Sequence, residues 1–180
     1  MRTAGLIVVL ALLAGCGKSG KIKKLAEAEH VHYYALRVFM DEDAEKAYLK
    51  LKTQAERDAW LRENNTPKQK IGDKISYWDM FYQYDDDDRL ALAEGEVEIG
   101  WKEEQVLMAW GAPYSRRRTT KRTATRSEIF IYRFEVDKNG NVLVWEPGSK
   151  ATYKAIELYQ YDLHVDDGVV TDMQRKEDWD

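Results

Sequence analysis

Cysteine is almost absent from this chain: Cys16 is the only one among 180 residues. A single cysteine excludes a disulfide within the chain and a metal site built from several thiolates. Histidine is also scarce, with three residues, and the sequence contains neither a His-Glu-x-x-His motif nor a Gly-x-Ser-x-Gly nucleophile elbow. We therefore expect no catalytic residue, no metal and no cofactor.

Long hydrophobic runs are also few. The stretch Ala4–Ala14 is apolar, but it is well short of the roughly 20 residues that a membrane-spanning helix needs. It follows the positive Arg2 and leads into Leu-Ala-Gly-Cys, with Cys16 last. A short positive start, an apolar run and small residues are typical of a secretory signal. The position of the cysteine predicts a lipoprotein signal, and an ordinary secretory signal with an incidental cysteine is the alternative.

The lipoprotein interpretation sets the first boundaries. It predicts a signal peptide over 1–15 and a lipidated tether over 16–21, with the membrane anchor on Cys16. Gly17 follows the cysteine, and no aspartate is there to indicate retention in the inner membrane. We therefore expect the periplasmic face of a bacterial outer membrane.

The charge balance argues against nucleic-acid and nucleotide ligands. The formal net charge is −4 and becomes −5 once Arg2 is lost with the signal, whereas nucleic-acid-binding domains are usually basic. The Gly17-Lys18-Ser19 triplet resembles the end of a phosphate-binding loop, but such a loop needs a glycine where Leu12 stands. We expect neither ligand.

The segment 22–95 has the pattern of a helical region. Apolar residues at helical spacing predict one helix over about 22–40. Asp41 or Asp43 is expected to cap a second helix, and Thr53-Gln-Ala-Glu56 is a capping box for a third. The aromatic stretch 75–84 predicts a further short helix. The acidic run 85–88 is interpreted as a solvated loop or a helix start, with weak divalent-cation binding as the alternative.

The segment 96–176 combines a helix with strands. Gly111 and Pro113 are expected to end the helix that begins near Glu103. Alternating apolar and polar residues predict strands, with Asn-Gly and Asp-Gly turn signals between them. The expected strands are 128–136, 142–145, 152–165 and 169–174.

This half of the chain resembles the SmpA/OmlA (BamE-like) outer-membrane lipoprotein domain. The resemblance implies an α+β fold in which helices pack on a small antiparallel sheet of three to four strands, and a non-enzymatic role at the outer membrane, in some members in barrel-protein assembly. A second similarity, to GWxTD-domain envelope proteins, lies in residues 56–60 and Gly100-Trp101. The positions that match the SmpA/OmlA pattern are Ile99, Gly100, Glu104, Gln105, Val106, Gly111, Pro113, Tyr132, Asp167 and Gly168.

The sharpest local feature is a basic segment over 116–126, which we expect to be a loop. A mobile solvated hairpin loop is one interpretation. The other is a site for anionic lipid head groups or an acidic partner, since each cation near an anionic membrane contributes about 1 kcal/mol. Its six cations are Arg116, Arg117, Arg118, Lys121, Arg122 and Arg126.

These observations together predict a lipid-anchored, non-enzymatic interaction or scaffold module that binds an envelope protein or the membrane surface. A periplasmic inhibitor or sensor is the alternative, and an envelope hydrolase is a further one. Hydrolysis would need a constellation of catalytic groups, and His164 with its acidic neighbours is interpreted as structural. His30 and His32 are also interpreted as structural, because residues two apart on a helix point in different directions.

Overall fold

The computed structural model describes residues 20–66, 75–120, 123–149 and 155–177, and these fall into two compact units. The first unit ends at Ala93 and the second begins at Glu94. The predicted signal 1–15 and Cys16 lie outside the described residues, as do Lys121 and Arg122 of the basic segment.

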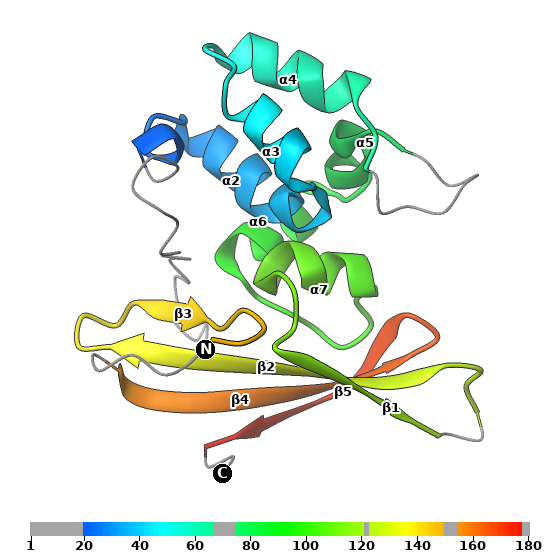
Figure 1. Ribbon diagram of the computed structural model, residues 1–180. Coiled ribbons are helices and arrows are strands. Elements are labelled where there is room, and N and C mark those ends of the chain that lie inside the picture. The colour runs from blue at the N-terminus through cyan, green and yellow to red at the C-terminus, as the bar shows by residue number, and fades with distance from the viewer. Residues whose placement is uncertain (1–19, 67–74, 121–122, 150–154, 178–180) are drawn as a thin grey trace. The chain divides into compact units, whose positions relative to one another are not determined.

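The first unit is helical, and its core is aromatic. Tyr33, Tyr48 and Tyr77 are almost fully buried. Trp60 stacks on Tyr77 with ring centroids 5.5 Å apart, and such pairs add to the stabilisation from buried apolar area. The helices are α2 (Glu27–Leu36), the 3-10 helix η1 (Arg37–Phe39), α3 (Glu42–Tyr48), α4 (Gln54–Glu63), α5 (Tyr77–Tyr82) and α6 (Asp86–Glu94) (Figure 1).

Two of the predicted helix starts are confirmed atom by atom. Thr53 Oγ1 accepts from the Glu56 amide at 3.2 Å, while Glu56 Oε2 accepts from the Thr53 amide at 3.0 Å. Asp41 Oδ1 accepts from the Ala44 amide at 2.8 Å. These bonds satisfy amide groups that the first turn of a helix leaves without partners.

The single helix expected over 22–40 is wrong. The backbone at Ala26 is extended, with ψ at 163°, and α2 begins only at Glu27. The Ala26 amide donates to Glu29 Oε2 at 2.8 Å, which satisfies it without a preceding helical turn. The acidic run 85–88, expected to be a solvated loop or a helix start, is a helix start, since α6 begins at Asp86.

The second unit is α+β. Strands β1, β2, β4 and β5 follow one another in an antiparallel sheet, and β3 pairs with β2 along the same edge as β1. The described sheet has five strands rather than three to four, because β1 was not expected. The elements are α7 (Glu103–Trp110), β1 (Ser115–Thr119), β2 (Ser127–Asp137), β3 (Val142–Val144), β4 (Ala155–Asp166) and β5 (Val169–Lys176).

Helix α7 covers one face of this sheet (Figure 1). Trp110 on α7 makes edge contacts with Tyr132 and Phe134 of β2, with centroids 5.1 and 5.0 Å apart. Its indole Nε1 donates to the Gly95 carbonyl at 2.6 Å. Gly111 ends the helix with a φ of 77°, a conformation that favours glycine.

Candidate interaction surface on the first strand

The first three cations of the basic segment lie on a strand, so the expectation of a loop is wrong for them. Strand β1 pairs with β2 in register, with Arg116 opposite Phe130 and Arg118 opposite Glu128. The sequence Ser-Arg-Arg-Arg-Thr has no apolar alternation, which is why it did not predict a strand. Long arginine side chains are tolerated there because β1 is an edge strand, where charge is common.

The Arg116 side chain contacts other residues of the second unit. Its Nη1 donates to Glu103 Oε1 at 2.7 Å, and its guanidinium lies 4.1 Å from the centroid of the Phe130 ring. Glu103 stands in the first turn of α7, where negative charge also suits the helix dipole. Arg116 therefore ties the edge strand to the helix.

Arg126 is also paired internally. Its Nε donates to Glu128 Oε2 at 3.0 Å, and its Nη2 contacts the same carboxylate. The Arg126 Nη2 also lies 3.6 Å from Glu103 Oε2. Hydrogen bonding to Glu128 raises the pKa of Arg126 above its ordinary value, so the guanidinium stays charged.

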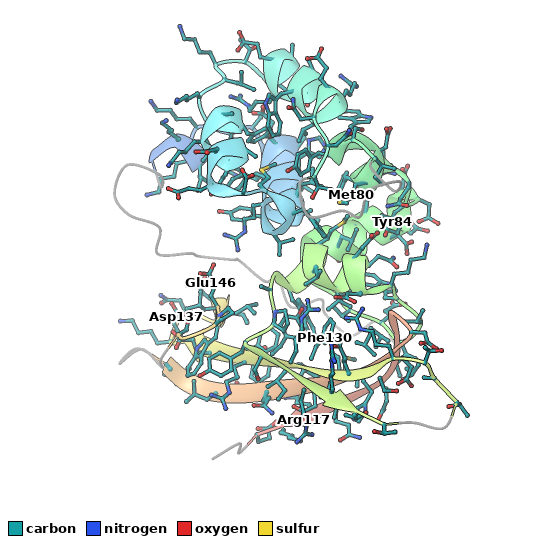
Figure 2. The ribbon with its side chains drawn as sticks, turned by 45° about the vertical axis from the view of Figure 1, so that its right-hand side comes forward. Met80, Tyr84, Arg117, Phe130, Asp137 and Glu146 are labelled. Atoms are coloured by element: carbon teal, nitrogen blue, oxygen red, sulfur yellow. The ribbon has the colours of Figure 1, made fainter. Side chains whose placement is uncertain are left out.

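Of the arginines in the basic segment that the structure describes, Arg117 and Arg118 lack a strong internal partner, and we call these two arginines open. Arg118 Nε is 3.9 Å from Glu128 Oε1, and its side chain is 92 % exposed, so this pair is weak. Arg117 is exposed, and its side chain has no hydrogen bond or ion pair among the described contacts. Since side chains alternate along a strand, the register places Arg118 on the same face as Phe130. Arg117 lies on the opposite face from Phe130 (Figure 2).

The end of the basic segment is fixed by the second predicted turn. Asp167 Oδ1 accepts from the amides of Thr125 at 3.0 Å and Arg126 at 2.8 Å. Asp167 has a φ of 49°, and Gly168 has a φ of 85°. The Asp-Gly turn between β4 and β5 thereby holds the residues that lead into β2.

No protein family model, curated protein or solved structure matches this chain. The kind of ligand that this surface can bind is therefore inferred from its geometry and charge. In the described part of the basic segment, Arg116 and Arg126 pair with Glu103 and Glu128. Arg117 and Arg118 leave an excess of positive charge at the edge of the sheet, suited to carboxylate or phosphate groups.

His30, His32 and two acids near His164 lie in structural surroundings. His30 Nε2 lies 2.8 Å from the Ile22 carbonyl oxygen, and His32 is buried in the helical unit. Asp162 and Asp166, near His164 in sequence, accept instead from Gln160 and Ser127 at 2.6 and 2.7 Å. In the described part of the chain, no three His, Cys, Asp or Glu side chains form a metal-binding group. No described helix is long and apolar enough to cross a bilayer.

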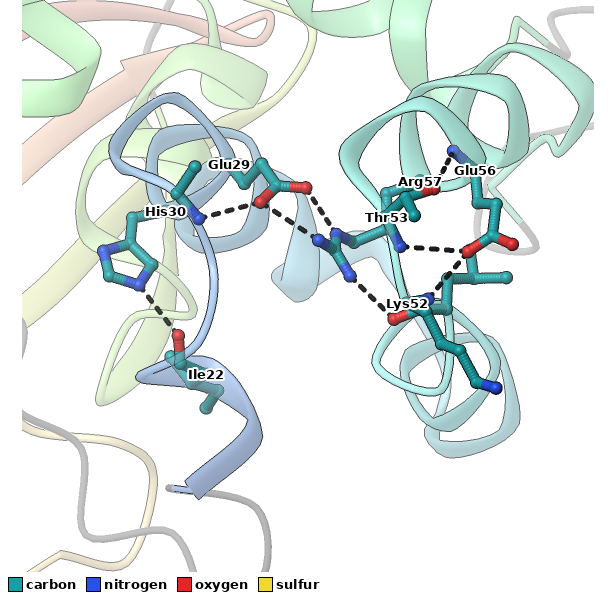
Figure 3. Close-up of polar contacts among 9 residues, drawn as sticks. Ile22, Glu29, His30, Lys52, Thr53, Glu56 and Arg57 are labelled. Carbon is teal, nitrogen blue, oxygen red and sulfur yellow. Dashed lines mark hydrogen bonds and ion pairs between the residues drawn. The ribbon is translucent and has the colours of Figure 1, made fainter.

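The helical unit contains a polar centre that sequence reasoning missed (Figure 3). Glu29 is 1 % exposed and Arg57 is 7 % exposed. Arg57 contacts Glu29 through Nε and donates to Glu29 Oε2 through Nη2 at 3.1 Å. Its Nη1 donates to the Leu51 carbonyl at 2.7 Å. This bidentate pair joins α2 to α4 in the core.

Sequence reasoning also missed Glu103 and Glu128, the acids that decide which arginines stay open. The sequence indicates Glu103 only as the approximate start of a helix. Glu128 is only two residues from Arg126, which immediately precedes β2, and this short separation was an available signal. No local pattern indicates that Arg116 reaches Glu103.

Proposed function

We propose that this protein is a lipid-anchored, non-enzymatic interaction module of the bacterial outer membrane that binds an envelope protein through strand β1. The SmpA/OmlA-like pattern supports a role in envelope or barrel-protein assembly. The lipoprotein pattern at Cys16 supports attachment to the periplasmic face. In this proposal the anchor concentrates the module at the membrane, and β1 supplies the contact.

The observation that carries the proposal is the open pair Arg117 and Arg118 on an edge strand. Arg116 contacts Glu103 and Arg126 contacts Glu128, and β1 pairs with β2, so the position of β1 is fixed before a partner binds. A preorganised surface loses less conformational entropy on binding than a mobile loop does. This supports protein binding over a solvated loop without a role.

The test is recovery of the partner from detergent-solubilised envelopes. The full lipidated chain is purified as wild type and as the double variant Arg117→Gln/Arg118→Gln. The matched control is Lys50→Gln/Lys138→Gln, which removes the same charge at two other exposed positions. We expect a specific envelope protein to accompany the wild type and the control and to be lost from the double variant.

Recovery of barrel-assembly proteins in this pattern would extend the proposal to that process. If one enzyme is recovered instead, and its activity falls on binding, the protein is an inhibitor. Equal recovery from all three proteins, or no protein at all, would overturn binding through β1.

A further inference from the structure

We propose that the partner of β1 is an acidic segment of another protein that binds in extended conformation as an additional strand. This inference rests on the proposed function and specifies how the partner binds to β1. Strand β1 pairs with β2 on one side, and within the described residues no strand pairs with its other side. Half of the backbone N–H and C=O groups of an edge strand point outward and can hydrogen-bond an added strand.

The charge on β1 disfavours a second copy of this chain as that strand. An antiparallel pair of β1 strands centred on Arg117 would place Arg117 opposite its own copy and Arg116 opposite Arg118. Like charges directly opposite each other on adjacent strands are destabilising. The same arginines attract carboxylates, so this edge disfavours pairing with a second β1 strand and favours pairing with an acidic strand.

The placement of the two open arginines specifies the pattern of acids. Arg117 and Arg118 are adjacent in sequence and project from opposite faces of the sheet. A strand with two consecutive Asp or Glu residues also presents them on opposite faces. One carboxylate can then meet each guanidinium, while the backbone bonds run along the strand, about 17 Å for a five-residue strand.

The same geometry favours a peptide over a lipid surface. A membrane is flat on the scale of one strand and would meet the guanidinium on one face of the sheet. An extended chain along the edge reaches both faces. Arg116 adds nothing to a lipid contact of this kind, because Glu103 already accepts from it.

The probe is a fluorescent synthetic peptide, Val-Thr-Glu-Glu-Thr-Val with blocked ends, titrated against the detergent-solubilised full chain. Two further versions carry N-methyl groups on the odd or on the even residues. Only alternate amides of an added strand face its neighbour, so we expect one methylated version to lose binding and the other to retain it. Hydrogen exchange should slow at β1 amides when the unmodified peptide binds.

Protein variants complete the test. We expect Arg117→Gln and Arg118→Gln each to weaken peptide binding about twofold to fivefold, the range of one exposed ion pair. Lys138→Gln should leave it unchanged. Vesicles of phosphatidylcholine and phosphatidylglycerol in equal parts serve as the lipid probe.

Equal binding of both methylated peptides would overturn strand addition and leave a purely electrostatic contact. Vesicle binding that depends on Arg117 and Arg118, without peptide binding, would overturn it in favour of lipid. Absence of binding to either probe would also overturn it. Recovery of an envelope partner through β1 would still uphold the proposed function in each of these cases.

Discussion

Glu29 is a carboxylate in the core of the helical unit, and its ionised form depends on Arg57. Burial raises the pKa of Glu29, but hydrogen bonds from Arg57 and from the Ala26 amide outweigh it, and the pKa lies below its ordinary value of 4.5. A lowered carboxyl pKa stabilises the fold above pH 4.5, and the contribution is lost as the pH falls through the folded pKa.

Removal of one partner from this pair should be more damaging than removal of both. Glu29→Ala leaves the Arg57 charge buried without its partner, which costs about 3–5 kcal/mol. The double variant Glu29→Leu/Arg57→Met replaces the pair by apolar groups, and we expect it to recover most of that loss. Urea denaturation of the three proteins measures this, and a double variant less stable than Glu29→Ala would contradict the prediction.

His32 should make the helical unit sensitive to mild acid. Burial lowers the pKa of His32 below its ordinary value of 6.5, while Asp58 and Glu29 oppose the shift and Arg62 and Arg89 add to it. Its Nε2 lies 2.9 Å from the Tyr82 hydroxyl, and its Nδ1 is buried without a partner. The unfolded chain takes up a proton near pH 6.5, which the folded chain resists.

The free energy of unfolding should therefore fall as the pH is lowered below 6.5. Protonation of Glu29 should lower it further only below pH 4.5. His32→Phe keeps a ring beside Phe81 and Tyr82. In this variant the free energy of unfolding should no longer fall between pH 6.5 and pH 4.5. His30→Gln is the control and should preserve this fall. Denaturation series at several pH values test this, and an unchanged slope in His32→Phe would show that another group titrates.

At the level of elements, β1 has two kinds of arginine, and stability should separate them. Arg116→Gln breaks the contact with Glu103 and the stacking on Phe130, a loss of about 1 kcal/mol for a half-exposed pair. Arg117→Gln removes no described contact and should leave the free energy of unfolding unchanged. Thermal unfolding of the two variants provides the comparison, and equal destabilisation would mean that Arg117 has a structural partner.

At the level of the whole molecule, attachment should depend on one residue. If Cys16 carries the anchor, Cys16→Ser moves the protein from the membrane fraction to the soluble fraction, because multiple acyl chains hold far more strongly than one basic patch. Fractionation at high salt makes the measurement, since salt screens the arginine contribution. A Cys16→Ser protein that still sediments with membranes at high salt would contradict the anchor.

The sequence by itself determined several helix caps, helix ends and turns, although it did not determine the start of α2 or the strand β1. The capping box at Thr53, the end of α7 at Gly111 and the Asp-Gly turn were predicted and confirmed. A cap at Asp41 or Asp43 was also predicted, and the structure shows that it is Asp41. Each depends on residues only a few positions apart or on the φ of one glycine. Such interactions are present in the sequence as short patterns, whatever the rest of the chain does.

Only the tertiary structure decided which charges are open. Glu29 and Arg57 are 28 residues apart in the sequence. Arg116 on β1 contacts Glu103 on α7. Strand β1 exists because β2 offers it a register, although its own residues favour no strand. A sequence pattern with a period of two or 3.6 residues indicates which face of an element is buried, but it does not say which side chain of a distant element lies beside a given residue.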